Sequence, residues 1–196
     1  MNWTEAVAVV FGAAAVALTI RQSLWCWPLG LVQVALYVYV FYQARLYSDM
    51  VLHVIYVVLQ VYGWYRWRRG ERGSALPVSY LSLTERAGWA MAIALAASVW
   101  GEAMLRYTDA AAPRADAFIA AASLAAQYLL AIKKLENWIV WIVVDVVAIA
   151  VYWGRDLRLT SGLYGVFLGL CVLGLIEWRK AYERERSGGA VAVAPV

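Results

Sequence analysis

Seven apolar stretches alternate with short polar segments along this chain. Each stretch has about 17–25 residues, the length that an α-helix needs to cross the hydrocarbon core of a bilayer. The pattern therefore predicts an all-α membrane protein with seven transmembrane helices. The predicted helices are approximately Thr4–Ile20, Trp25–Gln43, Tyr47–Tyr65, Glu85–Leu105, Arg114–Ile132, Glu136–Trp153 and Leu159–Trp178.

The segments between the helices are short, apart from two. Residues 66–84 are charged and rich in glycine, and residues 106–113 are polar and end in proline. We expect a single transmembrane domain over residues 1–182. Residues 183–196 contain a Gly-Gly pair and a late proline, so we expect a disordered tail there.

The first and last thirds of the chain carry a similar order of residues, which indicates an internal repeat. The offset between matching residues is 110 or 111, with one residue inserted in the second copy before its glycine. A 3+1+3 layout follows, with repeat 1 at about 4–67, a linking helix at about 85–105 and repeat 2 at about 114–178. The matches are Trp27, Tyr42, Arg45, Gly63 and Trp67 with Trp138, Tyr152, Arg155, Gly174 and Trp178.

Composition supports membrane insertion and excludes several other classes. Hydrophobic residues make up 64% of the chain and charged residues 15%, against roughly 45–50% and 25% in soluble domains. The net charge of +4 gives no case for nucleic-acid binding, because the basic residues lie between apolar spans. Cys26 and Cys171 fall within spans and form neither a disulfide framework nor a zinc motif. No phosphate-binding loop or nucleophile–base pair occurs, so we expect neither an enzyme nor a bound cofactor or metal.

The distribution of Lys and Arg predicts the orientation in the membrane. With the N-terminus outside, the cytoplasmic segments carry twelve of the 17 basic residues and the opposite side carries five. Cytoplasmic loops are enriched in Lys and Arg. We therefore expect a multi-pass protein of the plasma (inner) membrane with its C-terminus in the cytoplasm.

The segment Asn137–Asp145 places a carboxylate inside an apolar span. A charge near the bilayer centre costs a few kcal/mol, so Asp145 should face protein or a water-filled cavity. Trp138, Trp141 and Asp145 are spaced i, i+3, i+7 and share one helical face. Two indoles and a carboxylate could sandwich an aromatic, cationic small molecule. Alternatively, the tryptophans form an interfacial belt and Asp145 is satisfied by Gln33, Tyr37 or Gln60 of another helix.

Other polar side chains also follow helical faces within the spans. Gln33 and Tyr37 are i, i+4 neighbours, and Gln127 is isolated in the fifth span. These faces could line a pathway or hold helices together, and the sequence favours neither reading. His53 has no second ligand nearby and makes a poor metal site. Glu136, in the first turn of the sixth helix, complements the helix dipole, and Asn137 could do likewise or cap the helix. The polar face of the third span comprises Asp49, His53, Tyr56, Gln60 and Trp64.

Two short motifs resemble those of a known membrane family. The segment Glu136–Trp141 reads E-N-W-x-x-W, and Tyr62–Trp67 reads Y-G-W-x-x-W. Both are similar to motifs of the PnuC family of nicotinamide riboside transporters, and the likeness extends from Glu5 to Trp178. The resemblance implies a 3+1+3 bundle similar to the SWEET sugar transporters, often assembled as a homotrimer. It also implies uptake without ATP hydrolysis or ion coupling, with the substrate trapped by cytoplasmic phosphorylation.

The resemblance also implies a set of substrate-binding residues. The aromatic clamp of the family corresponds to Trp138 and Trp141, and polar positions near its ligand match Asn137 and Gln127. The cationic pyridinium of nicotinamide riboside suits indole faces, but so does the thiazolium of thiamine, and relatives also carry riboflavin or deoxynucleosides. A non-transporting membrane scaffold or sensor is the alternative of a different class. Further substrate-binding residues, assigned mainly by their helical faces, are Trp27, Gln33, Tyr37, Tyr56, Gln60 and Asp145.

Overall fold

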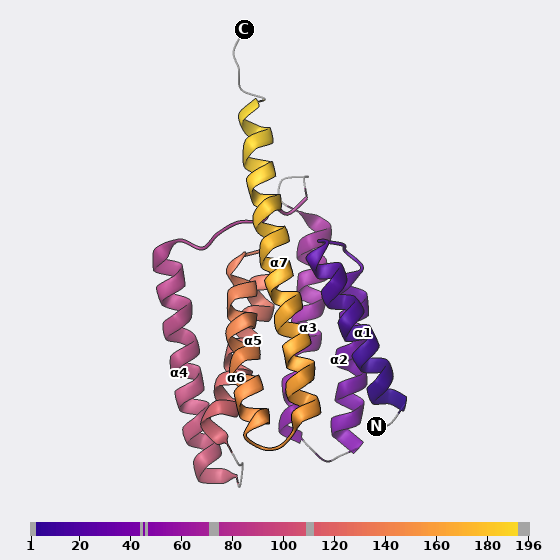
Figure 1. Cartoon of the computed structure of the whole chain (residues 1–196), viewed down its shortest axis with the longest axis vertical. Coiled ribbons are helices and arrows are strands. Elements are labelled where there is room, and N and C mark those ends of the chain that lie inside the picture. The colour runs from indigo at the N-terminus through magenta and orange to yellow at the C-terminus, as the bar shows by residue number, and fades with distance from the viewer. Residues whose placement is uncertain (1–2, 44, 46, 71–74, 109–111, 192–196) are drawn as a thin grey trace. The chain divides into compact units, whose positions relative to one another are not determined.

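Seven α-helices make up the chain in the computed structural model, which describes residues 3–43, 45, 47–70, 75–108 and 112–191. No strand occurs within these residues, so the predicted all-α class is confirmed (Figure 1). Each predicted span corresponds to one helix. The helices are α1 (Trp3–Ile20), α2 (Cys26–Gln43), α3 (Tyr47–Arg69), α4 (Leu83–Tyr107), α5 (Pro113–Ala131), α6 (Glu136–Trp153) and α7 (Arg158–Val191).

Local sequence explains where α4 begins and why α7 is longer than predicted. Ser82 accepts a hydrogen bond from the Glu85 amide and the Glu85 carboxylate accepts one from the Ser82 amide, which forms a capping box. Charged pairs one turn apart, such as Arg179 with Glu183, support α7 beyond its apolar part. The prediction of disorder from Glu183 is therefore wrong up to Val191, and residues 192–196 lie outside the described part.

Three helical segments are long and apolar enough to cross a membrane by length and composition alone. They are Leu83–Tyr107, Glu136–Trp153 and Thr160–Ser187, and Val7–Ile20 is a shorter apolar segment. Among the remaining helices, α3 is interrupted by polar residues: it carries His53, Gln60 and three arginines in its last turn. That all seven helices cross the membrane stays a prediction for the helices outside these three segments.

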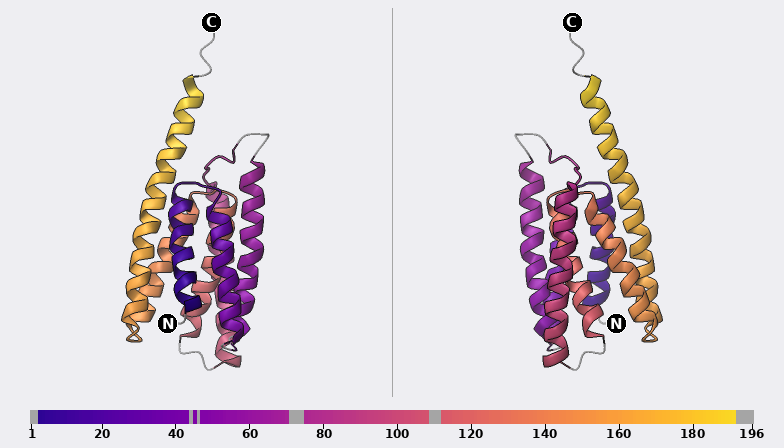
Figure 2. Two further views of the ribbon diagram at one scale, coloured as in Figure 1. Left: turned by 90° about the vertical axis from the view of Figure 1, so that its right-hand side faces the viewer. Right: turned by 90° about the vertical axis from the view of Figure 1, so that its left-hand side faces the viewer.

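The helices fall into two compact units. Unit 1 comprises Met1–Ser79, Ala131–Lys133 and Ile176–Val196, and unit 2 comprises Tyr80–Leu130 and Lys134–Leu175. These bounds do not follow the predicted repeats, because the last part of α7 belongs to unit 1. Within unit 1, α1 packs on α2 and α2 on α3, and the three run side by side in both Figure 1 and Figure 2.

Glycines in unit 1 allow large side chains to approach a neighbouring helix. The indole of Trp27 in α2 occupies the space that a side chain on Gly63 of α3 would need. The Gln33 amide lies 2.9 Å from the position of a Cβ built on Gly12 of α1. The Gln60 amide of α3 approaches Gly30 of α2 in the same way, so small residues set the spacing of these helices.

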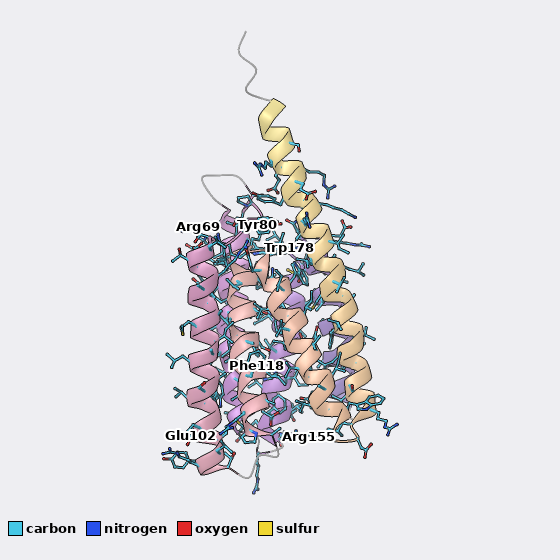
Figure 3. All side chains as sticks on the ribbon, turned by 60° about the vertical axis from the view of Figure 1, so that its left-hand side comes forward. Arg69, Tyr80, Glu102, Phe118, Arg155 and Trp178 are labelled. Atoms are coloured by element: carbon cyan, nitrogen blue, oxygen red, sulfur yellow. The ribbon has the colours of Figure 1, made fainter. Side chains whose placement is uncertain are left out.

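In unit 2, a glycine likewise allows a large side chain to pack between α6 and α7. A Cβ on Gly174 of α7 would lie 2.6 Å from three ring atoms of Trp138. Farther along, the Ser161 hydroxyl donates to the Ile149 carbonyl at 3.2 Å. Figure 3 labels Arg155 at the end of this unit, where its Nη2 lies 3.5 Å from Asp116 Oδ2 of α5.

Backbone conformation repeats along the chain at a constant interval. The non-glycine residues with positive φ in the described part are Gln22 (φ 55°), Arg45 (58°), Lys133 (53°) and Asp156 (56°). Lys133 follows Gln22 by 111 residues, and Asp156 follows Arg45 by the same number. One offset of 111 thus relates both turns, and the inserted residue expected from the pairing of Arg45 with Arg155 is not needed.

Candidate substrate site

The buried face of α6 carries most of the predicted substrate residues of unit 2. Asn137 has no exposed surface, and Trp138 and Asp145 are 2% and 3% exposed. Trp141 is half-buried on the same side, whereas Ile139, Val143 and Val146 are exposed. The predicted common face of Trp138, Trp141 and Asp145 is therefore present. Its residues lie inside unit 2 at different depths.

Asn137 lies inside α6 and does not cap it. The structure assigns the N-cap to Leu135, which makes no side-chain capping hydrogen bond. The Asn137 amide nitrogen donates to the Lys134 carbonyl at 2.6 Å, and its Oδ1 has no partner in the protein. The alternative that Asn137 caps the helix is therefore wrong. Its buried oxygen is an acceptor that a ligand can use.

Asp145 pairs with a residue that the sequence did not single out. Its carboxylate accepts a hydrogen bond from the thiol of Cys171 in α7, and Oδ2 has no partner in the protein. None of the ion pairs among the described residues includes Asp145. A buried carboxylate without a cation is costly, which makes this position suitable for a positively charged ligand.

Trp138 and Trp141 differ in what surrounds them. Trp138 packs against Gly174, and a side chain in place of that glycine would collide with its ring. Trp141 keeps part of its surface exposed. Of the two predicted clamp residues, Trp141 is thus the one that keeps exposed surface in this conformation.

Gln127 is the predicted site residue on α5. Its side chain is buried beside a face of small residues, and its Nε2 has no partner in the protein. A primary amide nitrogen is a hydrogen-bond donor, so Gln127 complements the acceptors of Asn137 and Asp145. The small residues of that face are Ala117, Ala121, Ala122, Ala125 and Ala126.

The other predicted residues belong to unit 1. Gln33 and Gln60 pack against glycines and are half-buried. Tyr37 and Tyr56 both contact His53, with ring centroids 5.5 and 5.6 Å from its own. Trp27 is fully buried, and its ring meets that of Trp67 edge-on at 5.2 Å. The side chain of Asp49, expected on the same polar face, lies outside the described part.

Glu136 makes contacts beyond the helix dipole that its position in the sequence predicts. Both of its carboxylate oxygens accept from the Leu81 amide at 3.1 Å, and Oε1 lies 2.8 Å from Arg86 Nη2. The Lys134 ammonium donates to the Tyr80 carbonyl at 3.3 Å. The turn before α6 therefore holds the segment that leads into α4. The 50-residue separation of Glu136 from Arg86 left no local signal for this pair.

Comparison with known proteins identifies the family. The model of a family described as nicotinamide mononucleotide transporter matches residues 2–180. The chain belongs to this family. A relative from Neisseria mucosa, named nicotinamide riboside transporter PnuC, is 32% identical over 93% of this chain and 74% of its own length. A protein of the same name from Escherichia coli K12 is 23% identical over 98% of this chain and 91% of its own.

Two further similarities extend the comparison. The riboflavin/roseoflavin transporter RibM of Streptomyces davaonensis is 25% identical over 90% of this chain and 84% of its own. The crystal structure of the vitamin B3 transporter PnuC matches with a TM-score of 0.73 at 28% identity, covering 93% of this chain and 83% of that one. Family membership and the apolar helices together make this a multi-pass membrane protein of a transporter family.

Proposed function

We propose that this protein is a facilitative transporter for nicotinamide riboside. Its relatives in Neisseria mucosa and Escherichia coli carry that substrate in their names, and the matching crystal structure is of a vitamin B3 transporter. We further propose uniport, with the substrate trapped in the cytoplasm by phosphorylation.

The observation that supports this substrate most directly is a set of unpaired buried polar atoms in unit 2. Asn137 Oδ1, Gln127 Nε2 and Asp145 Oδ2 have no partner in the protein. Each such atom costs about 1–3 kcal/mol unless a ligand or water satisfies it. Two acceptors and one donor fit the carboxamide and hydroxyl groups of nicotinamide riboside, and the carboxylate fits its cationic ring.

Two other vitamins remain as alternatives within the same class. Thiamine also carries a cationic aromatic ring, and the relative RibM is a riboflavin transporter by name. Riboflavin is uncharged, so a site that needs the charge of Asp145 disfavours it. The Asp145 carboxylate is therefore the feature that separates cationic from neutral substrates.

Calorimetric titration of the purified protein with nicotinamide riboside, thiamine and riboflavin tests the proposal. We expect nicotinamide riboside to bind most tightly, and a preference for thiamine or riboflavin would assign the chain to that substrate. Binding of none of the three would favour the scaffold or sensor alternative. A nicotinamide riboside kinase gene beside this one would support the first outcome, and thiamine salvage genes the second.

We also propose that α1–α3 and α5–α7 are two repeats linked by α4. The offset of 111 supports this, because it relates the positive-φ turns and also two tryptophan–glycine contacts. Trp27 packs on Gly63, and 111 residues later Trp138 packs on Gly174. Cysteine cross-linking between α4 and each repeat would test the layout.

The proposed orientation has the N-terminus outside and the C-terminus in the cytoplasm of the plasma (inner) membrane. It rests on the bias of Lys and Arg toward one side. Protease access to a tag on either terminus in oriented vesicles tests it. We further propose a homotrimer, which the family resemblance supports, and the mass of the protein in detergent tests that assembly.

A further inference from the structure

Two pairs of residues related by the offset of 111 touch each other within unit 1. Lys133 Nζ donates to Gln22 Oε1 at 2.9 Å, and Lys133 follows Gln22 by 111 residues. The rings of Trp67 and Trp178, also 111 residues apart, have their centroids 5.8 Å from each other. A two-fold operation exchanges such partners, so they contact each other only close to its axis. Under the proposed repeat, both pairs therefore lie on the axis.

The two pairs form one layer, because Lys133 of the first pair also contacts Trp67 of the second. Its Nζ lies 4.6 Å from the centroid of the Trp67 ring, within cation–π range. The same Nζ donates to the Leu76 carbonyl at 2.9 Å. We call Gln22, Lys133, Trp67 and Trp178 the axial layer.

The axial layer is largely buried and is hydrogen-bonded to neighbouring segments. Lys133 is 7% exposed, and both tryptophans are buried. Trp178, labelled in Figure 3, donates from Nε1 to the Thr19 carbonyl at 3.0 Å, which ties it to the end of α1. Gln22 and Lys133 have left-handed backbone, which side-chain-bearing residues adopt only where their surroundings hold them. The contacts of the layer provide that support.

The axial layer lies where the path of the substrate to the cytoplasm is expected. Transporters built from repeats bind their substrate at the interface between the repeats, so a path from that site to the cytoplasm follows the axis. The layer lies at the end of the protein that contains the α1–α2 turn and the C-terminal end of α3. In the proposed orientation this is the cytoplasmic end.

We infer that the axial layer is the inner gate of the transporter and that the Lys133–Gln22 contact must open in each transport cycle. This inference rests on the proposed function. It assigns a conformational role to Lys133, which is not one of the predicted substrate-binding residues.

Reversible cross-linking of the gate tests the inference. In a background with Cys26→Ala and Cys171→Ala, the double variant Gln22→Cys, Lys133→Cys is placed in proteoliposomes and treated with a short, reducible bifunctional thiol reagent. We expect cross-linking to abolish uptake of nicotinamide riboside while calorimetry still detects binding, and reduction to restore uptake. For each single-cysteine variant, the reagent should leave uptake at the level of the same variant without reagent. Full uptake by cross-linked protein would overturn the gate.

A second variant covers the case in which the double variant does not fold. Lys133→Met keeps the length of the side chain and removes the ammonium from Gln22, Leu76 and Trp67. We expect efflux of nicotinamide riboside from preloaded vesicles to rise by a factor of about two to ten, the worth of one net hydrogen bond, with unchanged affinity. Lys180→Met, an exposed lysine of α7 paired with Glu177, is the matched control and should leave efflux as it is.

The two inferences fail in distinguishable ways. Wild-type efflux from the Lys133→Met variant, with binding intact, would overturn the gate alone. Absence of nicotinamide riboside binding to the wild-type protein would overturn the proposed function and the gate with it.

Discussion

Gly174 lies directly against the indole of Trp138, so that a Cβ on this glycine would come within 2.6 Å of ring atoms Cε2, Cζ2 and Cη2. Real Cβ atoms do not approach ring carbons so closely. The glycine therefore fixes where the ring of the E-N-W-x-x-W motif rests on α7, and it links helix packing to the candidate substrate site.

Gly174→Ala should destabilise the protein because the added methyl group must displace the Trp138 ring. Overpacking of this kind costs about 1–3 kcal/mol. Thermal unfolding of the purified protein in detergent measures the change. Gly169→Ala on the same helix is the matched control, because nothing lies within 4 Å of a Cβ there. Equal unfolding temperatures for the two variants would show that Trp138 moves aside at no cost.

Replacing the two clamp tryptophans should have different consequences. Trp141→Ala should weaken nicotinamide riboside binding by about tenfold or more through the loss of one stacking face, on the order of 1–2 kcal/mol. Trp138→Ala should weaken binding and also stability, since it empties a packed site at a cost of about 3–5 kcal/mol. Calorimetry and thermal unfolding separate the two effects.

The control for the tryptophan variants is Trp153→Ala at the end of the same helix. Trp153 is 60% exposed and should contribute neither to binding nor to the packing of α6 on α7. Normal binding by both Trp138→Ala and Trp141→Ala would assign these rings to the interfacial belt.

Arg86→Ala should destabilise the protein more than the removal of an exposed ion pair. Arg86 is partly exposed, but the side chain of its partner Glu136 is only 9% exposed and is left as a buried carboxylate. The Leu81 amide still donates to it, so we expect about 1–2 kcal/mol, below the range for breaking a fully buried pair. Arg106→Ala, which removes an exposed pair with Glu102, should cost about 0–1 kcal/mol. Equal unfolding temperatures for Arg86→Ala and Arg106→Ala would contradict the larger cost expected for Arg86→Ala.

The hydrophobic pattern predicted all seven helices because the bilayer fixes their length and the spacing of apolar residues. The predicted positions of helix ends are less accurate where charge or capping sets them. For example, ion pairs such as Arg179–Glu183 extend α7 beyond its apolar part. The sequence also located the common face of Trp138, Trp141 and Asp145, since i, i+3 and i+7 positions align on any helix.

Contacts between distant segments could not be predicted from local pattern. The sequence predicts Gln33, Tyr37 or Gln60 as the partner of Asp145, while the structure provides Cys171, for which the sequence excludes only a disulfide framework and a zinc motif. Lys133 is one of the basic residues that the sequence places on the cytoplasmic side, and its burial against Gln22 depends on a turn of the chain 111 residues earlier. Such pairings depend on how different helices pack together. The spacing of residues within one helix gives no information about that packing.

Transport should equilibrate the substrate without concentrating it. The proposed uniport predicts this result, because a uniporter couples substrate movement to no ion gradient. Uptake of nicotinamide riboside into substrate-free proteoliposomes should reach the same final level with and without an imposed proton or sodium gradient. Accumulation above the external concentration that tracks either gradient would rule out uniport.

Asp145→Asn should lower affinity for a cationic substrate and spare a neutral one. The substitution keeps the shape and an acceptor for the Cys171 thiol but removes the charge. We expect nicotinamide riboside to bind about tenfold more weakly or worse, equivalent to roughly 1.4 kcal/mol. The reduced, uncharged form of nicotinamide riboside should bind as it does to the wild-type protein.

Two further variants show whether the charge of Asp145 or its hydrogen bond matters. Cys171→Ala removes the thiol donor and leaves the carboxylate, so it should preserve the preference for the cation while lowering stability. Glu102→Gln removes an exposed carboxylate on α4 and should change neither ligand's affinity. If Asp145 only holds α6 to α7, Asp145→Asn and Cys171→Ala should both lose stability with unchanged affinities. An equal loss of affinity for the cationic and neutral ligands in Asp145→Asn would exclude a charge-specific role, because only the interaction with the pyridinium depends on the carboxylate charge.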